Sequence, residues 1–324
     1  MTPNLFNFKN ESINFEHYFN HTFATYRGIY GQLISGYMMI ERYAGGDLFK
    51  DEAEDDISKM YKNKTESFVS ILSQNKYYTQ FMSCENKDSY VARLMRFLNY
   101  DKVVTAEDYS TKLTNLSDRE MYQYVFDEAT KLDRKKSNFL LAAHIGGTHY
   151  GMDSPDKIYK NGKNSILNTY YNQDYWFGEF LNKFKKSPLA NNTIIVFTAD
   201  HAAFISPLFA KAFGLTVDMM RANFVSNVPL IIYKKGEKPL RLDAKNQNSL
   251  ALVPTILDLL EIKNVNNHFL GNSLFDVRQS HNPLLWLTVS GTQFISTATG
   301  IPKDISDNND LQDLVYQYYG YLER

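Results

Sequence analysis

The stretch Asn192-Thr-Ile-Ile-Val-Phe-Thr-Ala-Asp-His-Ala202 decides how this chain folds. Ile194 to Phe197 is an apolar, β-branched run, which is typical of a strand buried on both faces. The strand leads into Asp200 and His201, and open α/β sheets bind ligands at the carboxyl ends of their strands. Carboxylate and imidazole groups suit Zn²⁺ or Mn²⁺. Both can ligate one ion only if the chain bends there, because neighbouring residues of an extended chain point to opposite sides.

Taken alone, the pair has a plainer explanation, in which Asp200 caps a helix and His201 lies on the surface. The context favours a site, because two more buried strands are predicted. Phe139 to Ala143 runs into His144-Ile-Gly-Gly-Thr-His149, a glycine-containing loop suited to close approach of a ligand. Val228 to Tyr233 is the third predicted strand. Each histidine by itself is more often a hydrogen-bonded structural residue than a ligand.

A helix is expected to begin near Thr25 and to end near Gly36. Thr25 at its start is first of all a candidate N-cap. The same position would also hold a hydroxyl among free amides at the positive end of the helix dipole, which favours an anionic substrate or an alkoxide. Both interpretations of Thr25 stay open on the sequence.

The composition indicates a globular chain of 324 residues, with 44% hydrophobic and 22% charged residues. A net charge of −1 gives no support for binding nucleic acid, which requires a basic surface. Cys84 is the only cysteine, so no disulfide can form within the chain. We see no apolar run long enough to span a membrane and no signal peptide.

Several segments, in order, resemble the alkaline phosphatase/sulfatase superfamily. They are similar above all to the phosphoglycerol transferases of lipoteichoic acid and periplasmic glucan synthesis, and more loosely to phosphoethanolamine transferases. The matching segments are Thr2-Pro-Asn-Leu5, Thr25-Tyr-Arg-Gly28, Tyr175 to Leu181, Lys185 to Pro188, Asn192-Thr193, Ala199-Asp-His201, Asn227 to Tyr233, Val253 to Leu260 and Leu270 to Leu274. Together they cover roughly residues 1 to 275.

The resemblance implies a three-layer α/β/α sandwich with a mostly parallel central sheet. It makes Thr25 the nucleophile and a metal ligand, and it makes Asp200 and His201 ligands of a divalent metal, Zn or Mn. His144 and His149 would bind the substrate. So would Arg27, which lies in the Thr-x-Arg-Gly segment, and Arg93, which corresponds to a headgroup-binding arginine. The implied catalytic domain spans residues 1–278, with a C-terminal subdomain at 279–324.

The same resemblance implies the reaction and its setting. Thr25 would take a phosphoglycerol or phosphoethanolamine headgroup from a phospholipid donor and pass it to a glycan or lipid acceptor, or to water. The setting would be the periplasm or the extracytoplasmic face of the bacterial inner membrane, with an upstream membrane anchor possible outside this chain.

Three departures from the superfamily pattern shape the alternatives. The superfamily has a first strand, bearing an acidic metal ligand, before the segment that matches Thr2-Pro-Asn-Leu5, and this sequence lacks a match for it. Ala202 replaces the usual glycine, and the sulfatase Cys-x-Pro-x-Arg motif is missing. Because the first strand has no match, we expect a gap in the sheet with an aggregation-prone edge. The alternatives are a sulfuric or phosphoric monoester hydrolase that uses Thr25, and an inactive remnant that binds a headgroup.

Overall fold

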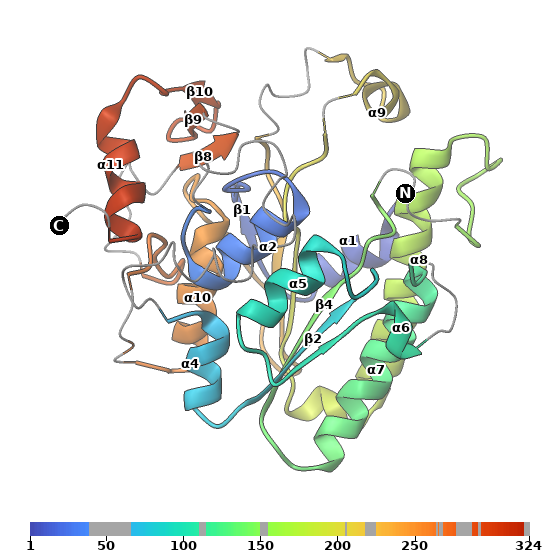
Figure 1. Cartoon of the computed structure of the whole chain (residues 1–324). Helices are drawn as coiled ribbons and strands as arrows, with labels where there is room; N and C mark the ends of the chain where they lie inside the picture. The colour runs from blue at the N-terminus through green and yellow to red at the C-terminus, as the bar shows by residue number, and fades with distance from the viewer. Residues whose placement is uncertain are drawn as a thin grey trace.

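The computed structural model describes residues 1–38, 66–109, 115–149, 155–204, 206–217, 225–263, 265, 268–276, 287–290 and 293–320. Helices cover both faces of a central β-layer, as Figure 1 shows, so the predicted α/β class is confirmed. Among the described residues, no helix is both long enough and apolar enough to span a membrane.

The central β-layer consists of two sheets. The first has the order β5-β6-β1-β7 and contains β5 (Ile195–Thr198), β6 (Leu230–Tyr233), β1 (Ile13–Glu16) and β7 (Leu240–Asp243). In it, β6 runs antiparallel to both β5 and β1, whereas β1 and β7 are parallel. The second sheet is fully parallel, with the order β3-β2-β4, and contains β3 (Lys102–Val104), β2 (Tyr78–Ser83) and β4 (Phe139–His144).

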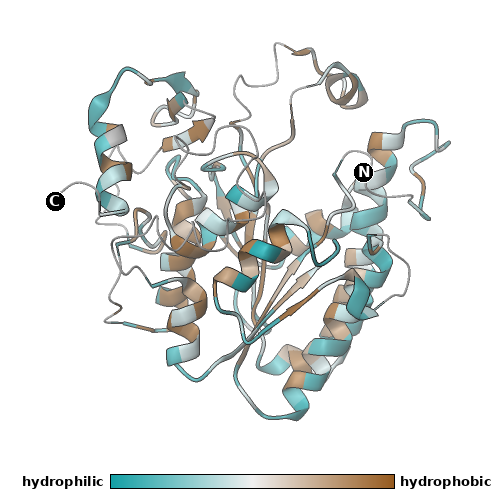
Figure 2. Cartoon of the chain, in the orientation of Figure 1, coloured by the Kyte–Doolittle hydropathy of each residue, from teal (hydrophilic) through white to brown (hydrophobic). Residues whose placement is uncertain are grey.

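The helices pack in two layers because their apolar faces turn toward the sheets, as the brown inner faces in Figure 2 show. One layer holds α7 (Asp118–Arg134) and α8 (Ser165–Lys186), which pack against each other. The other holds α2 (Thr25–Ile34), α4 (Phe68–Gln74), α5 (Tyr90–Phe97) and α10 (Leu252–Leu259), whose side chains share one core cluster. The shorter helices α6 (Ala106–Tyr109) and α9 (Pro207–Ala212) lie in connections.

The N-terminal segment Thr2-Pro-Asn-Leu5 begins α1 (Pro3–Asn10) and attaches it to α8. The Asp174 carboxylate accepts hydrogen bonds from the backbone amides of Asn4, at 3.1 Å, and Leu5, at 2.8 Å. Since α1 has no side-chain N-cap of its own, Asp174 satisfies amides that the helix end leaves free. Gly178 leaves room for the Asn4 side chain, because a Cβ there would lie 2.5 Å from Asn4 Cγ.

Two strand predictions are wrong in one respect. The runs at Phe139–Ala143 and Ile194–Phe197 form β4 and β5, but neither strand is buried. All residues of β5 are partly exposed, and Ala143 of β4 is exposed. Among the described residues, β4 pairs only with β2 and β5 only with β6, so each of these strands has one edge without a strand partner there.

The C-terminal segment forms a small unit of β8 (Leu287–Ser290), β9 (Gln293–Ser296), β10 (Lys303–Asp304) and α11 (Asn309–Tyr318). It packs on the end of α2, where the Tyr318 hydroxyl donates to the Ile34 carbonyl at 2.9 Å. A Cβ at Gly36 would lie 2.3 Å from the Tyr318 ring, so glycine is required for this close contact. The expected boundary near residue 278 lies outside the described residues.

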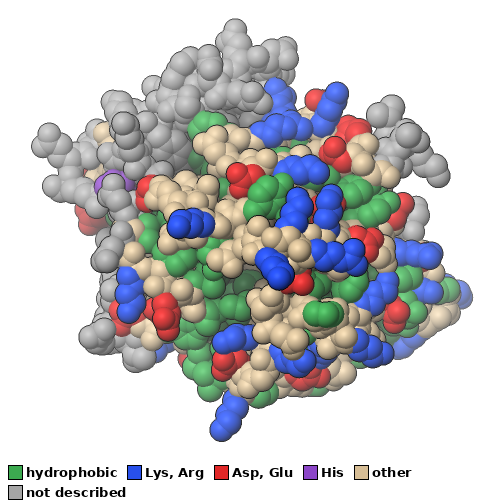
Figure 3. All heavy atoms as spheres, turned by 90° about the horizontal axis from the view of Figure 1, so that it is seen from below, with side chains coloured by type: hydrophobic (Ala, Val, Ile, Leu, Met, Phe, Trp, Pro, Cys, Tyr) green, Lys and Arg blue, Asp and Glu red, His purple; other side chains and the backbone are tan. Residues whose placement is uncertain are grey.

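The surface seen from below mixes side chains of different types. Figure 3 shows Lys and Arg side chains beside Asp and Glu, with hydrophobic side chains between them. This mixture agrees with the net charge of −1 for the whole chain.

Candidate functional site

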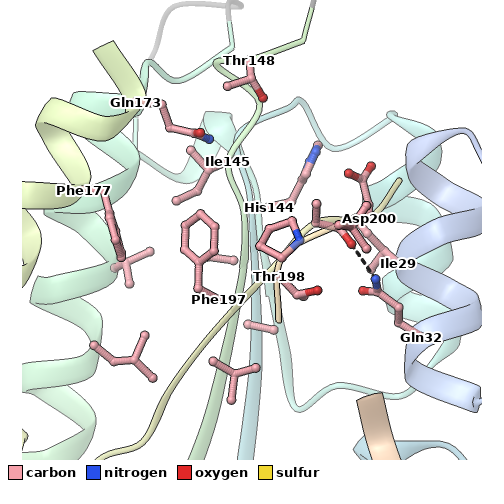
Figure 4. Close-up of a pocket in the computed structure, with 18 of the residues that line it drawn as sticks. Ile29, Gln32, His144, Ile145, Thr148, Gln173, Phe177, Phe197, Thr198 and Asp200 are labelled. Atoms are coloured by element: carbon pink, nitrogen blue, oxygen red, sulfur yellow. Dashed lines mark hydrogen bonds between the residues drawn. The ribbon is translucent and has the colours of Figure 1, made fainter. Parts of the chain in front are cut away.

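One cavity of about 2040 Å³ brings most of the predicted site residues together. It is lined at the strand ends by Thr25, His144, His149, Asp200 and His201. Figure 4 shows His144 and Asp200 at the ends of β4 and β5, between α8 on one side and α2 on the other. The cavity therefore contains a hydroxyl, a carboxylate and three imidazoles, contributed by three separate segments of the chain.

The first turn of α2 carries Thr25 into this cavity. Ala24 is the N-cap residue and makes no side-chain cap, so Thr25 is the first helical residue and its hydroxyl does not cap the helix. Ala24 has φ 74°, a conformation that a β-carbon disfavours and that costs on the order of 1–3 kcal/mol. The structure therefore places Thr25 at the start of a helix, among amides that lack intrahelical partners.

Gly28 fixes the position of this helix end relative to β5. A Cβ on Gly28 would lie 2.2 Å from the carbonyl oxygen of Asp200, which is far closer than atoms can approach. The glycine thus lets the helix backbone pack directly on the strand end. One turn further along, the Gln32 side chain donates to the Ala199 carbonyl at 2.7 Å and ties α2 to the same segment.

Asp200 and His201 bend toward each other after β5. His201 Nε2 lies 3.4 Å from Asp200 Oδ2, while Nδ1 lies 2.7 Å from the Ala202 carbonyl oxygen. Because a carbonyl only accepts hydrogen bonds, Nδ1 carries a hydrogen and donates it to the Ala202 carbonyl. A backbone carbonyl commonly orients a metal-binding histidine in this way.

This geometry fits two positions of a metal site. Two ligands bound tetrahedrally to zinc at its usual bond lengths are separated by about 3.3 Å, close to the observed Nε2–Oδ2 distance. Within the described part of the chain, however, no group of three or more His, Cys, Asp or Glu side chains is placed to hold a metal. Asp200 and His201 could therefore supply part of a ligand set, to which the hydroxyl of Thr25 would add an oxygen.

His144 and His149 come from the loop after β4. His144 Nδ1 lies 3.9 Å from the Sγ atom of Cys84, a weak contact that links the ends of β4 and β2. Gly147 in the loop packs against the buried Asp118 carboxylate, which would meet a Cβ at 2.0 Å. Gly147 thus lets the loop backbone approach closely, but what it approaches is Asp118 at the start of α7 instead of a ligand.

Cys84 itself is unsuited to covalent chemistry. It is 1% exposed, and burial raises the pKa of its thiol to about 12. A thiol must lose its proton to act as a nucleophile. Thr25 is therefore a better candidate nucleophile than Cys84.

The two predicted arginines lie apart from the cavity lining. Arg27 is buried, with its guanidinium carbon 5.5 Å from the centre of the Tyr26 ring. Arg93 is a partly exposed residue of α5. Neither residue lines the cavity. Their roles in substrate binding stay predictions.

Three cavity residues were not predicted from the sequence. Glu85 follows β2 and adds a carboxylate to the lining, while Gln32 and Thr198 add polar atoms near Asp200. The Thr198 hydroxyl is buried without a hydrogen-bond partner. Glu85 lies two residues after the end of β2, and a carboxylate just after a strand was the signal that could have found it. Thr198 was quoted as part of the strand but received no role.

Residues 1–262 match the sequence profile of the family described as Sulfatase. The chain belongs to the sulfatase family. A search of curated protein sequences found no match.

Several solved structures share the fold of this sulfatase-family chain. A protein of that superfamily from Vibrio parahaemolyticus superposes with TM-score 0.70 at 18% identity, covering 97% of this chain and 78% of its own. The lipoteichoic acid synthase LtaP from Listeria monocytogenes gives TM-score 0.70 at 15% identity, with 99% and 84% covered. A phosphonate monoester hydrolase from Silicibacter pomeroyi gives 0.52 at 13% identity, with 88% and 72% covered.

Family membership makes this chain an enzyme of the sulfatase-like hydrolases and transferases. Members of the superfamily generally depend on a divalent metal.

Proposed function

We propose that this chain is a metal-dependent phosphotransferase or phosphodiesterase with Thr25 as its nucleophile. The observation that carries the proposal is the position of Thr25, a helix-start hydroxyl that caps nothing and lines one cavity with Asp200 and His201. The only cysteine is buried with a raised thiol pKa, which speaks against cysteine-based chemistry.

In the proposed reaction the oxygen of Thr25 attacks the phosphorus of a phosphodiester. The bond from phosphorus to the lipid oxygen breaks, that oxygen takes up a proton, and the phospho-headgroup is left on Thr25 as a diester. An acceptor hydroxyl or water then attacks the phosphorus, and the Thr25 oxygen regains its proton. The positive N-terminal end of the α2 dipole stabilises negative charge on the phosphoryl oxygens.

Asp200, His201 and Thr25 would hold the divalent metal, Zn or Mn. Such an ion lowers the pKa of a bound hydroxyl and offsets charge on phosphoryl oxygens. Around it, the histidines of the β4 loop have roles of their own. His144 and His149 line the same cavity and can donate hydrogen bonds to a phosphate or to the leaving oxygen.

We further propose phosphoglycerol or phosphoethanolamine as the headgroup, a phospholipid as its donor, and a glycan or lipid of the bacterial cell envelope as the acceptor. A location in the periplasm or at the extracytoplasmic face of the inner membrane goes with these substrates. The structural similarity to a lipoteichoic acid synthase supports this choice.

The decisive test compares Thr25→Ala with the matched variant Thr299→Ala, an exposed threonine in the C-terminal unit. Each protein is incubated with Zn²⁺ or Mn²⁺ and with bis-p-nitrophenyl phosphate, p-nitrophenyl phosphate, p-nitrophenyl sulfate or labelled phosphatidylglycerol. We expect diester turnover in the parent and in Thr299→Ala, and a loss of at least about a thousandfold in Thr25→Ala. Turnover of the diester by Thr25→Ala would exclude Thr25 as the nucleophile.

A sulfuric or phosphoric monoester hydrolase is the second candidate, because a phosphonate monoester hydrolase and sulfatases share the fold. Preference for p-nitrophenyl phosphate or sulfate over the diester would establish it. A third candidate is a protein that binds a headgroup without turnover, since no three-ligand cluster lies within the described ranges. Binding of glycerophosphate without hydrolysis of any of these substrates would favour that function.

A further inference from the structure

Exposed apolar side chains gather in the segment that contains α9. Four of the nine large hydrophobic residues that the described chain exposes lie here, and we call them the apolar tip: Phe204, Leu208, Leu215 and Val217, each 40–59% exposed. Figure 1 shows α9 projecting from one end of the molecule, and Figure 2 shows brown, hydrophobic residues in it. Water solvates such a cluster poorly, so the exposure points to a partner that covers it.

The other side of this segment is packed. The centre of the Tyr170 ring of α8 lies 5.4 Å from that of the Phe213 ring and 6.2 Å from that of the Phe209 ring. The two phenylalanine rings are 4.6 Å apart, and Ala210 of α9 is buried. Because these contacts give the segment a packed side against α8, the exposure of the apolar tip is a property of the folded segment.

Lysines flank the apolar tip. Lys211 is exposed on α9 and is the only charged residue among the described residues from 202 to 217. A loop before α8 packs on the same end of α8, since the Tyr159 ring lies 5.9 Å from the Tyr171 ring and the Tyr159 amide donates to the Asn168 side chain at 2.9 Å. This loop carries three more lysines, Lys157, Lys160 and Lys163. The tip therefore has a border of positive charge, which we call the lysine border and define by these four lysines.

The single carboxylate of the two segments is already engaged. Among their described residues Asp156 is the only acidic one, and it accepts a hydrogen bond from Trp176 Nε1 at 2.7 Å and lies 3.9 Å from Arg119 Nη1. The Lys157 ammonium lies 4.7 Å from the centre of the Tyr175 ring. Tyrosine and tryptophan beside basic residues are typical of the boundary between a bilayer and water. The surface thus suits a partner with anionic groups outside and hydrocarbon beneath.

We propose that the apolar tip and the lysine border dock this chain on the surface of an anionic lipid bilayer. Leu208 and Leu215 enter the boundary of the hydrocarbon, while Lys211 and the loop lysines contact lipid phosphates. The tip projects from the molecule, which suits a fluid surface better than a partner that needs a groove.

A second copy of this chain is a poorer partner. Two-fold related copies that met through the apolar tip would bring their lysine borders together, because such an interface uses the same patch twice. Like charges brought together oppose association. A bilayer instead offers phosphate groups to the lysines and hydrocarbon to the tip.

Docking in this way places the candidate active site next to the lipid. Phe204, Leu208 and Leu215 also line the cavity, and the centre of the Phe204 ring lies 5.0 Å from that of the His201 ring. A bilayer at the tip therefore lies beside the cavity that contains Asp200 and His201. The inference goes beyond the proposed reaction and does not depend on it, because docking requires only the tip and the lysines.

Docking is measured by co-sedimentation of the 324-residue chain with vesicles, without metal or substrate. The vesicles consist of phosphatidylcholine alone or of phosphatidylcholine with about one-third phosphatidylglycerol. We expect binding to the anionic vesicles that is at least about tenfold tighter than to the neutral ones and that weakens as NaCl is added. Absence of binding to the anionic vesicles would overturn the proposal.

Two pairs of variants locate the contact. Leu208→Asp should weaken binding at least about tenfold, because a charge replaces an inserted apolar side chain. Its control is Leu240→Asp, at a 49% exposed residue that begins β7. Since β7 runs in the same direction as β5, Leu240 lies at the end of the sheet remote from Asp200. Lys211→Glu should weaken binding about fivefold, whereas Lys238→Glu, at an exposed residue before β7, should leave it unchanged.

A label on the tip provides a second readout. Cys84 is 1% exposed, so a thiol-reactive nitrobenzoxadiazole dye labels the introduced thiol of Leu208→Cys selectively. We expect the fluorescence of this label to increase and to shift to the blue on anionic vesicles, because the dye leaves water. The fluorescence of labelled Leu240→Cys should stay unchanged.

The proposal is overturned if Leu208→Asp binds the vesicles as tightly as Leu240→Asp, or if the label at position 208 does not respond to them. It is also overturned if the chain alone forms a dimer that Leu208→Asp abolishes, because a second copy would then cover the tip. None of these measurements uses turnover, so they stand apart from the test of Thr25.

Discussion

Strands β5 and β6 are adjacent, similar in composition and opposite in environment. Leu230, Ile231 and Ile232 of β6 are 0–2% exposed, whereas every residue of β5 is partly exposed. The difference lies in the neighbours, because β6 is flanked by β5 and β1, whereas β6 is the only partner of β5 in the part of the chain that the structure describes. An apolar run therefore specifies a strand, but burial requires a second strand beside it.

The largest expected effect comes from removing matched isoleucines in these two strands. Ile232→Ala should lower the free energy of unfolding by about 2–5 kcal/mol, because it leaves a cavity in a packed core. Ile195→Ala in β5 should cost less than half as much, because its surroundings are already open. Urea unfolding of both variants tests this, and equal losses would mean that Ile195 of β5 is as well packed as Ile232 of β6.

A second test moves to the contact between the packed helix α2 and the open end of β5. Gly28→Ala places a Cβ 2.2 Å from the Asp200 carbonyl oxygen, so the helix end must move. We expect destabilisation of about 1–3 kcal/mol and a loss of turnover. Gly214→Ala is the control, because its Cβ meets nothing within 4 Å and only its positive φ is strained. Unchanged turnover in Gly28→Ala would show that the position of the α2 end does not affect the active site.

The third effect, the smallest when counted per pH unit, concerns an imidazole buried in the packed region. His21 is 0% exposed, with Nδ1 2.6 Å from the Ser249 hydroxyl, and burial lowers its pKa to about 3. An unfolded histidine titrates near about 6.5, so the unfolded chain binds the additional proton between these values. The free energy of unfolding should therefore fall by roughly 1.4 kcal/mol per unit as the pH drops below about 6.5.

This pH dependence is measured by urea unfolding between pH 4.5 and 7.5. His21→Gln should flatten the slope, whereas His17→Gln, which replaces an exposed histidine, should keep it. Equal slopes in His21→Gln and the parent would show that other groups cause the acid sensitivity.

Local signals in the sequence were sufficient for much of the fold. The strand at β5, the helix that begins at Thr25 and the glycine loop after β4 were all predicted within a few residues, because hydrophobic periodicity and turn residues act over short distances. The family resemblance implied a common site for Thr25, His144, His149, Asp200 and His201, and all five line one cavity. Glu85 and Thr198 received no role from the sequence, although both lie near strand ends and line this cavity.

The sequence by itself determined where most of the helices and strands lie, which residues could carry the chemistry, and that Cys84 does not lie in the sulfatase Cys-x-Pro-x-Arg motif. Only the tertiary structure decided that the Thr25 side chain does not cap α2 and that Arg27 does not line the cavity. It also decided that β4 and β5, among the described residues, each have one edge without a strand partner. The physical reason is that propensity is a property of a short segment, whereas burial and hydrogen-bond satisfaction depend on which distant segments lie beside it.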